Sequence, residues 1–360
     1  MIYLKTLKLI NFRCYQEVVL EFSPHLNILV GPNAAGKTTV VEAVHCLGFL
    51  KSHKAGIDAE MISYDQDFAV IKGNFEKEGK LQEVVFSLSA QGKRILANQK
   101  PFRQLSEYLG FLHVVFFCPE DLEIVKGAPG VRRKFLDSNL CLVSEAYMKS
   151  LIIYRKLLKQ RNEVLKNINE NHKYDRKLLE VLTGQMIPQA ETLIKEREHF
   201  IRELNPLIEE KSLAISGGKE KVSLLYMPSN YTGTERDSFF DIKKDLNSKT
   251  TTSGPHRDDF EFLINGFKAA AFASQGQQRT TALSLKLALA DYLNKKTEDI
   301  IIILDDVFSE LDSERQNQIL KLLNSEYQIF ITTTSISNLS EEILKDNKII
   351  TVRREEYKNA

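Results

Sequence analysis

The sequence has little net charge, few cysteines and no long hydrophobic run. Its 49 basic and 48 acidic side chains leave a formal charge of +1. Any attraction to nucleic acid must therefore come from local patches rather than from the field of the whole molecule. The four cysteines stand far apart with no C-x-x-C pair, which argues against a zinc site and against a disulfide framework. This use of cysteine fits a reducing cytoplasm.

Signals for export or membrane insertion are also missing. The N-terminal stretch MIYLKTLKLINFRCY alternates apolar and polar residues instead of forming the apolar core of a signal peptide. No apolar run approaches the roughly 20 residues that a membrane span needs. We find no internal repeat and no low-complexity segment. These absences predict a soluble, unprocessed cytoplasmic protein with no membrane partner.

The 360 residues are 43% hydrophobic, enough for a large core in one domain with an insertion or in two domains. The first third reads as short alternating strands, and residues 26–30 form a buried strand that runs into a glycine-rich loop. From about 131 to 212 the apolar residues recur at three- and four-residue steps, which is typical of helices. Strand character returns at 221–227 and 259–264, and Asn265-Gly266 is a hairpin signal.

The return to strands after the helices predicts an inserted helical segment. We expect an α/β head over residues 1–125 and 215–360, with an α-helical arm over 126–214. The arm would be an antiparallel helix pair, with a kink at Pro188. Its first helix, over residues 145–168, would be about 36 Å long at 1.5 Å per residue, too short for an extended coiled coil.

The strongest single motif is a glycine-rich loop between a predicted strand and a predicted helix. GPNAAGKT (31–38) matches G-x-x-x-x-G-K-[ST] in the context that this motif requires. In such a loop, backbone N–H groups and the helix N-terminus cradle phosphates. Catalytic Lys37 would reach the β- and γ-phosphates, and the Thr38 hydroxyl would ligate Mg²⁺. The predicted ATP contacts are Gly31, Pro32, Asn33, Ala34, Ala35, Gly36, Lys37, Thr38 and Thr39.

A second motif places two aspartates after an apolar strand. IIIILDD (300–306) delivers Asp305 and Asp306 to the C-terminal edge of a parallel strand, where such sheets bind ligands. This is a Walker B pattern, in which Asp305 would hold Mg²⁺ and Asp306 would orient or deprotonate the attacking water. The plainer alternative is an acidic loop that caps the next helix through Asp312 or Ser313.

A third motif opens a predicted helix about 25 residues before the two aspartates. SQGQQR (274–279) occupies the place of the signature segment of ABC ATPases, which completes the γ-phosphate site of a partner subunit. A helix N-terminus with serine and glycine binds anions. An ordinary serine N-cap would explain Ser274 but not the order of all three motifs. We predict an ATP site shared by two copies, with contacts in trans from Ser274, Gln275, Gly276, Gln277, Gln278 and Arg279.

The order and spacing of these motifs resemble the RecF family of bacterial recombinational-repair ATPases, which is related to the SMC proteins. The resemblance covers nearly the whole chain and also rests on NFRCY near the N-terminus, on residues 118–137 and on TTSGPHRDDF (251–260). It implies an ABC-type P-loop ATPase head, a mixed sheet with helices, that carries the inserted helical arm. It also implies a homodimer that forms on ATP, binds DNA, hydrolyses ATP slowly and works with RecR and RecO to load RecA at gaps.

The resemblance assigns further roles by position. It implies that Arg13 approaches the adenine and that Asp312, in the D-loop, lies near the P-loop of the partner. Glu120 and Asp121 stand where transporter ATPases carry a glutamine, and ITTTS (331–335) stands in the place of their switch histidine. Both departures fit the repair family and predict slow turnover.

Basic side chains gather in the helical stretch. Residues 146–177 carry nine Lys or Arg against three acids, whereas residues 298–314 carry seven acids and no Lys or Arg. Phosphate contacts by such residues bind DNA without sequence preference. The alternative is a solvated helix face that only keeps the protein soluble. The predicted DNA contacts are Arg132, Arg133, Lys149, Arg155, Lys156, Lys159 and Arg161.

These motifs lead to the hypothesis of an ATP-gated DNA clamp, in which ATP joins two copies and their arms close over duplex DNA. Three rival interpretations stay open beside it. The ATPase subunit of an ABC transporter would have a switch histidine and no basic arm. A GTPase or small kinase would make SQGQQR an accident, and the sequence has no N-K-x-D motif. In the third, ATP is only structural. His256 could be a ligand or a catalytic base, although a histidine beside Pro and Arg is more often structural.

Overall fold

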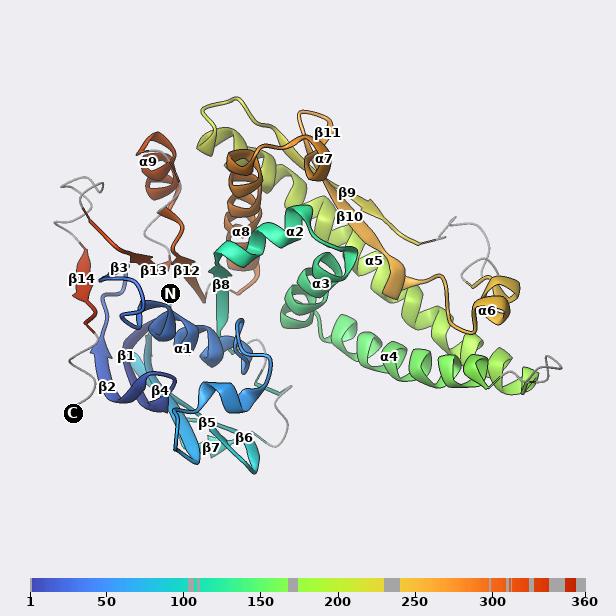
Figure 1. Cartoon of the computed structure of the whole chain (residues 1–360), viewed down its shortest axis with the longest axis horizontal. Coiled ribbons are helices and arrows are strands. Elements are labelled where there is room, and N and C mark those ends of the chain that lie inside the picture. The colour runs from blue at the N-terminus through green and yellow to red at the C-terminus, as the bar shows by residue number, and fades with distance from the viewer. Residues whose placement is uncertain are drawn as a thin grey trace. The chain divides into compact units, whose positions relative to one another are not determined.

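The structure is a computed structural model (Figure 1), and it describes residues 2–102, 107–108, 111–167, 174–229, 240–297, 299–308, 311, 313–323, 327–336 and 347–353. The chain divides into two compact units. The first unit consists of Met1–Asp121, Ala214–Gly217 and Leu283–Ala360, and the second of Leu122–Leu213 and Gly218–Ala282. Each unit is described by itself below.

The first unit contains an antiparallel sheet with the strand order β2-β1-β4-β5-β6-β7. Its strands are β1 (Ile2–Phe12), β2 (Tyr15–Glu21), β4 (Phe68–Lys77), β5 (Lys80–Ser89), β6 (Gly92–Ala97) and β7 (Lys100–Pro101). Alternate side chains of β4, such as Ile71 and Phe75, are fully buried. This alternation, which the sequence predicts, turns one face of the sheet toward the core.

A second sheet of this unit is parallel, with the order β14-β3-β13-β12-β8. Its strands are β3 (Leu26–Val30), β8 (His113–Phe117), β12 (Ile300–Asp305), β13 (Gln328–Thr333) and β14 (Lys348–Thr351). All side chains of β8 and β12 are buried, as expected for continuous apolar runs in a parallel sheet.

Helix α1 (Lys37–Phe49) contacts strands of both sheets. Its sequence is apolar on nearly every side, and Val40, Val44 and Leu47 are fully buried. A helix without a polar face has to be covered all round. One core therefore joins α1 to both sheets. The unit also contains the short 3₁₀ helices η1 (Asp58–Met61) and η3 (Pro119–Asp121) and helix α9 (Ser313–Leu322).

The second unit is built mainly from helices. They are α2 (Leu122–Lys126), α3 (Pro129–Val143), α4 (Glu145–Lys166), α5 (Arg176–Ile215), α6 (Ile242–Ser248), α7 (Ala269–Phe272) and the start of α8 (Gln275–Thr297), with the 3₁₀ helix η5 (Pro255–Arg257). A small sheet of β9 (Val222–Met227), β10 (Asp259–Ile264) and β11 (Phe267–Lys268) completes the unit. Asn265 and Gly266, with φ of 51° and 86°, form the predicted hairpin turn. No described helix combines the length and the apolar character that a membrane crossing requires.

The boundary between the units differs from the predicted one. The sequence assigned all of 215–360 to the head, whereas residues 218–282 belong to the second unit. Local packing explains the difference, because β10 contacts α3 and α7 contacts α2. A change from helical to strand periodicity therefore does not mark the boundary here. Helix α5 runs through Pro188 and Pro206.

Candidate nucleotide site

The glycine-rich loop joins β3 to α1 in the first unit, as predicted from the sequence. Gly36 has a φ of 105° at the N-terminus of α1, and a Cβ there would lie 2.6 Å from Tyr15 Oη. A Cβ on Gly31 would lie 2.3 Å from the carbonyl oxygen of Val352. Both positions therefore need glycine, one for its backbone conformation and both for space.

Lys37 lies inside this loop with 9% of its surface exposed. Its Nζ donates to the carbonyl oxygens of Gly31 at 2.7 Å and Pro32 at 2.8 Å. Burial lowers the pKa of Lys37, and the nearby carboxylates of Asp306 and Asp305 oppose that shift. An ammonium group that is partly desolvated and held by neutral carbonyls is well placed to bind phosphate.

The predicted magnesium ligands come together next to the loop. Thr38 Oγ1 donates to Asp305 Oδ1 at 3.0 Å, and Thr332 Oγ1 donates to the same oxygen at 2.7 Å. Asp305 is 2% exposed, and burial raises its pKa although both hydroxyls favour its charged form. A buried carboxylate beside a hydroxyl oxygen suits a small, hard cation such as Mg²⁺. The residues present therefore fit the predicted metal.

Asp306 follows at the end of β12 with a φ of 54°. This left-handed conformation is uncommon for a residue other than glycine and occurs often at functional sites. Its backbone N–H donates to Thr332 Oγ1 at 2.9 Å, and its side chain is exposed. The structure thus brings Lys37, Asp305 and Asp306 together, and Thr332 is the residue of ITTTS that contacts both aspartates.

Lys54 is a member of this site that the sequence analysis missed. Its Nζ lies 3.9 Å from Asp305 Oδ2. The Ser52 hydroxyl, which donates to Glu42 on α1, accepts the backbone N–H of Lys54 at 2.9 Å. The only signal in the sequence is the basic stretch KSHK directly after the helix that follows the loop.

Arg13 is tied to helix α1. Its guanidinium donates to both carboxylate oxygens of Glu42, at 2.6 and 3.1 Å, and to the carbonyl oxygen of Glu60 at 2.7 Å. This two-point contact braces the turn after β1 against α1. The contact with adenine stays a prediction.

The residues at the place of the transporter glutamine behave differently from each other. Asp121 accepts from Lys286 Nζ at 2.8 Å and from the backbone N–H of Cys118 at 3.0 Å. Asp121 therefore closes the turn after β8. Glu120 is exposed beside it. Asp312, the predicted D-loop residue, lies outside the described residues.

The signature segment opens α8 in the second unit. Ser274 Oγ accepts the backbone N–H of Gln277 at 3.3 Å, and Gln277 Oε1 accepts the backbone N–H of Ser274 at 3.0 Å. This reciprocal pair is a capping box. Ser274 is thus an N-cap, and both Ser274 and Gln275 are exposed. Capping and anion binding are compatible, because a capped helix still has its positive dipole end at the first turn.

Two of the predicted DNA contacts are corrected by the structure. Arg161 is completely buried, forms an ion pair with Asp245 at 2.7 Å and donates to Thr251 at 2.7 Å. Arg132 is 8% exposed and binds both carboxylate oxygens of Asp259, at 2.6 and 2.8 Å. Side chains that are buried and paired in this way cannot reach a phosphate backbone.

The other five basic residues are more accessible. Arg133 is half-buried and donates to the carbonyl oxygen of Asp258 at 2.8 Å. Lys149 and Arg155 are exposed and form surface ion pairs with acidic neighbours. Lys156 and Lys159 are exposed on α4. The exposed basic face of α4 is defined as Lys149, Arg155, Lys156 and Lys159.

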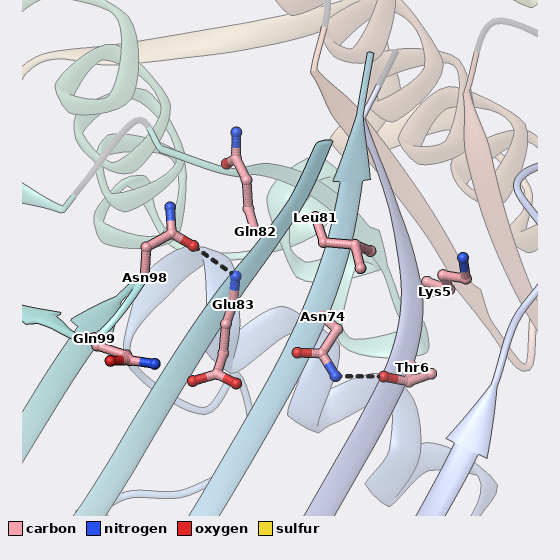
Figure 2. A pocket seen from close by; sticks show the side chains of 8 residues that line it. All are labelled: Lys5, Thr6, Asn74, Leu81, Gln82, Glu83, Asn98 and Gln99. Carbon is pink, nitrogen blue, oxygen red and sulfur yellow. Dashed lines mark hydrogen bonds between the residues drawn. The ribbon is translucent and has the colours of Figure 1, made fainter. Parts of the chain in front are cut away.

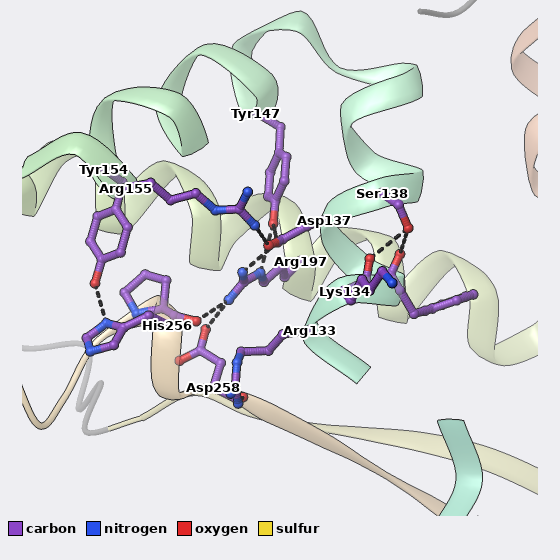
Figure 3. A network of polar contacts seen from close by, with 12 residues as sticks. Arg133, Lys134, Asp137, Ser138, Tyr147, Tyr154, Arg155, Arg197, His256 and Asp258 are labelled. Carbon is purple, nitrogen blue, oxygen red and sulfur yellow. Dashed lines mark hydrogen bonds and ion pairs between the residues drawn. The ribbon is translucent and has the colours of Figure 1, made fainter. Parts of the chain in front are cut away.

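The motif TTSGPHRDDF braces the helices of the second unit through the network in Figure 3. At its centre, buried Arg197 donates to Asp258 at 2.9 Å and to Asp137 at 2.8 Å. His256 Nε2 lies 3.1 Å from the carbonyl oxygen of Thr251, so Nε2 donates and Nδ1 accepts from the Tyr154 hydroxyl at 2.7 Å. Burial lowers the pKa of His256 to about 4. This neutral, doubly bonded histidine has a structural place.

A separate hollow of about 530 Å³ lies on the antiparallel sheet (Figure 2). It is lined by Lys5, Thr6, Asn74, Leu81, Gln82, Glu83, Asn98 and Gln99. None of these lining residues belongs to the glycine-rich loop, to the two aspartates or to SQGQQR. The hollow is therefore separate from the candidate nucleotide site, which is formed by the glycine-rich loop and its aspartates.

Comparison with known proteins shows the family to which the chain belongs. The model of the RecF/RecN/SMC N terminal domain family matches residues 3–359. The DNA replication and repair protein RecF of Staphylococcus epidermidis is 38% identical over 366 residues, which cover 98% of this chain and 99% of the relative. The protein of the same description from Shouchella clausii is 40% identical over 359 residues, 96% of each chain. The chain belongs to the RecF family.

Solved structures agree with membership of the RecF family. The recombination mediator protein RecF-ATPrS of the RecFOR pathway has a TM-score of 0.87 and 32% identity, over 98% of this chain and 96% of that one. An SMC head domain from Pyrococcus furiosus, with a TM-score of 0.56 and 16% identity, covers 94% of this chain and 92% of its own, and shows the fold alone. The predicted fold class, an ABC-type ATPase head with a helical insertion, is confirmed. A transporter subunit is not favoured.

Proposed function

We propose that this RecF-family protein is an ATPase of recombinational DNA repair in which bound ATP joins two copies on DNA. The observation that carries the proposal is the meeting of Lys37, Thr38 and Asp305 at the glycine-rich loop. A structure of a relative has been solved as RecF-ATP, which supports the choice of nucleotide. The proposed arm is the helical part of the second unit.

In this proposal the loop from Gly31 to Thr39 wraps the phosphates, and Lys37 moves from its carbonyl partners to the β- and γ-phosphates. Thr38 and Asp305 would hold Mg²⁺, which offsets phosphate charge when bound. Arg13 lies nearest the adenine. Asp306 orients the attacking water. Hydrolysis is slow because this side chain is one methylene shorter than the glutamate usual at this position of ABC ATPases.

The partner copy completes the site. Ser274 and the first turn of α8 present a hydroxyl and a helix N-terminus to the γ-phosphate of the other copy. Asp312 lies near the partner's P-loop. Because ATP bridges both surfaces, the dimer forms with ATP and separates after hydrolysis. Asp306→Asn should therefore retain the ATP dimer longer than the unchanged chain in a gel-filtration time course.

DNA binds through the exposed basic face of α4 without reading sequence. The relative's place in the RecFOR pathway supports RecR and RecO as partners, with RecA loading at gaps as the outcome. Because this repair takes place on chromosomal DNA, the protein acts in the cytoplasm.

Light scattering with and without ATP and duplex DNA tests the proposal. We expect the mass to double with ATP and the dimer to bind DNA. Ser274→Arg should bind ATP and stay monomeric, because the larger side chain blocks the partner's γ-phosphate. A wild-type monomer at saturating ATP, or a dimer of Ser274→Arg, would contradict the shared site.

A further inference from the structure

An exposed apolar patch lies directly before the signature segment in the second unit. Phe267 is 68% exposed and Phe272 is 73% exposed, and Ala270 and Ala271 between them are also exposed. The two phenyl rings pack edge to face with their centroids 6.3 Å apart. These four residues are called the aromatic patch below. Large exposed aromatic side chains that lie together commonly mark a binding surface.

The local structure holds this patch toward solvent. The tight turn at Asn265-Gly266 joins β10 to β11, and buried Ala269 anchors the short helix that follows. Both rings therefore sit on paired or anchored backbone, and each ring limits the motion of the other. Ordered aromatic side chains lose little conformational entropy when a partner covers them.

The charges around the aromatic patch favour a protein partner over a nucleic acid. Lys268, which lies between the rings in sequence, is paired with Glu261 at 2.9 Å. A surface that stacks nucleic acid bases combines aromatic rings with cations that are free to meet phosphates. Lys268 is one cation with an acidic neighbour, and the patch itself consists of two phenyl rings and two alanines. Apolar burial against another protein surface suits the patch better.

The sequence position of the patch identifies that protein. Phe272 is two residues from Ser274, so their Cα atoms lie at most about 7 Å apart. A surface that receives Ser274 and the first turn of α8 therefore lies within reach of the Phe272 ring, which is 73% exposed. We propose that the aromatic patch docks on the second copy of this chain in the ATP dimer. This inference rests on the proposed shared site, to which it adds an apolar contact beside the phosphate contact.

A tryptophan reporter tests the contact directly, because the chain contains no tryptophan. Phe272→Trp places a single indole in the patch. We expect its emission to shift to the blue when ATP is added, as the ring leaves water, and to stay unchanged in a Lys37→Ala background. An ATP dimer seen by light scattering without any spectral shift would overturn the inference.

Removal of the rings is the second test. Phe267→Ser with Phe272→Ser should raise the dissociation constant of the ATP dimer at least about tenfold. The affinity of the monomer for a fluorescent ATP analogue should not change, since both rings lie outside the nucleotide loop. Circular dichroism confirms folding. Leu81→Ser is the matched control, because Leu81 is 66% exposed on β5 and lies outside the patch.

The outcomes separate the two proposals. If the double variant dimerises like the wild type while Ser274→Arg stays monomeric, the aromatic patch is not part of the interface and the shared site stands. If Ser274→Arg also dimerises with ATP, the shared site is wrong and the inference falls with it.

Discussion

The charged side chains of the candidate nucleotide site in the first unit are arranged differently from the buried ion pairs of the second unit. At this site, Lys37, Asp305 and Asp306 meet at the ends of parallel strands. Lys37 donates to carbonyl oxygens, Asp305 accepts from hydroxyls, and Lys54 Nζ lies 3.9 Å from Asp305. In the second, buried arginines such as Arg161 and Arg197 are paired with carboxylates at 2.7 to 2.9 Å. A charged side chain whose partners are neutral carbonyls or hydroxyls is available to bind a ligand. A buried charged side chain that is paired with an opposite charge supports the fold.

The largest effect that would test this comparison is on stability in the second unit. Arg161→Ala should lower the free energy of unfolding by about 3–5 kcal/mol, because it leaves the buried carboxylate of Asp245 uncompensated. Thermal unfolding followed by circular dichroism measures it. Lys156→Ala, on the exposed side of the same helix, is the control. An unchanged transition in Arg161→Ala would show that the pair is not structural.

Lys37→Ala should act on binding instead of folding. We expect ATP affinity to fall at least about a hundredfold, since two or more charge-assisted contacts with phosphate are lost. The unfolding temperature without nucleotide should not fall, because the partly desolvated ammonium group of Lys37 does not stabilise the fold. Titration with a fluorescent ATP analogue gives the affinity, with exposed Lys80→Ala as control. Tight ATP binding by Lys37→Ala would remove the P-loop assignment.

The histidine network gives a pH dependence with a definite sign. The pKa of His256 is about 4 in the folded protein and 6.5 in the unfolded chain. The unfolded chain therefore takes up the proton first as the pH falls. Stability from His256 is therefore present above pH 6.5 and lost toward pH 4. Between pH 6.5 and 5 this amounts to about 2 kcal/mol at most.

Melting temperatures across that pH range measure the effect. His256→Phe should flatten the slope, whereas exposed His199→Gln should keep it. Equal slopes in the wild type and His256→Phe would show that His256 is protonated in the fold.

The smallest effect belongs to exposed charge in the second unit. Lys156→Ala with Lys159→Ala should leave stability unchanged within about 0.5 kcal/mol. Duplex DNA affinity should fall several-fold, with a salt slope lower by about 2, because two phosphate contacts are lost. Fluorescence anisotropy over a salt series measures both. If Lys243→Ala with Lys244→Ala weakens binding equally, the face of α4 is not the specific contact.

The sequence predicted what depends on neighbouring residues. The strand, glycine-rich loop and helix around Lys37 are contiguous, and the turn at Asn265-Gly266 is fixed by two residues. Side-chain pairs between distant segments were not predictable. Arg132 binds Asp259, 127 residues away, and Lys54 reaches Asp305 only through tertiary packing. A count of basic residues therefore mixed structural arginines with exposed lysines.

The neighbours of β3 have a consequence for synthesis. The strand that leads into the nucleotide loop lies between β13 and β14, so its partners are residues 328–333 and 348–351. On the ribosome, β3 leaves the tunnel long before either of these neighbouring strands has been made. The carbonyl oxygen of Val352, which packs against Gly31, arrives later still. We expect that only a chain translated past Val352 can assemble the nucleotide loop, so shorter nascent chains do not compete for ATP.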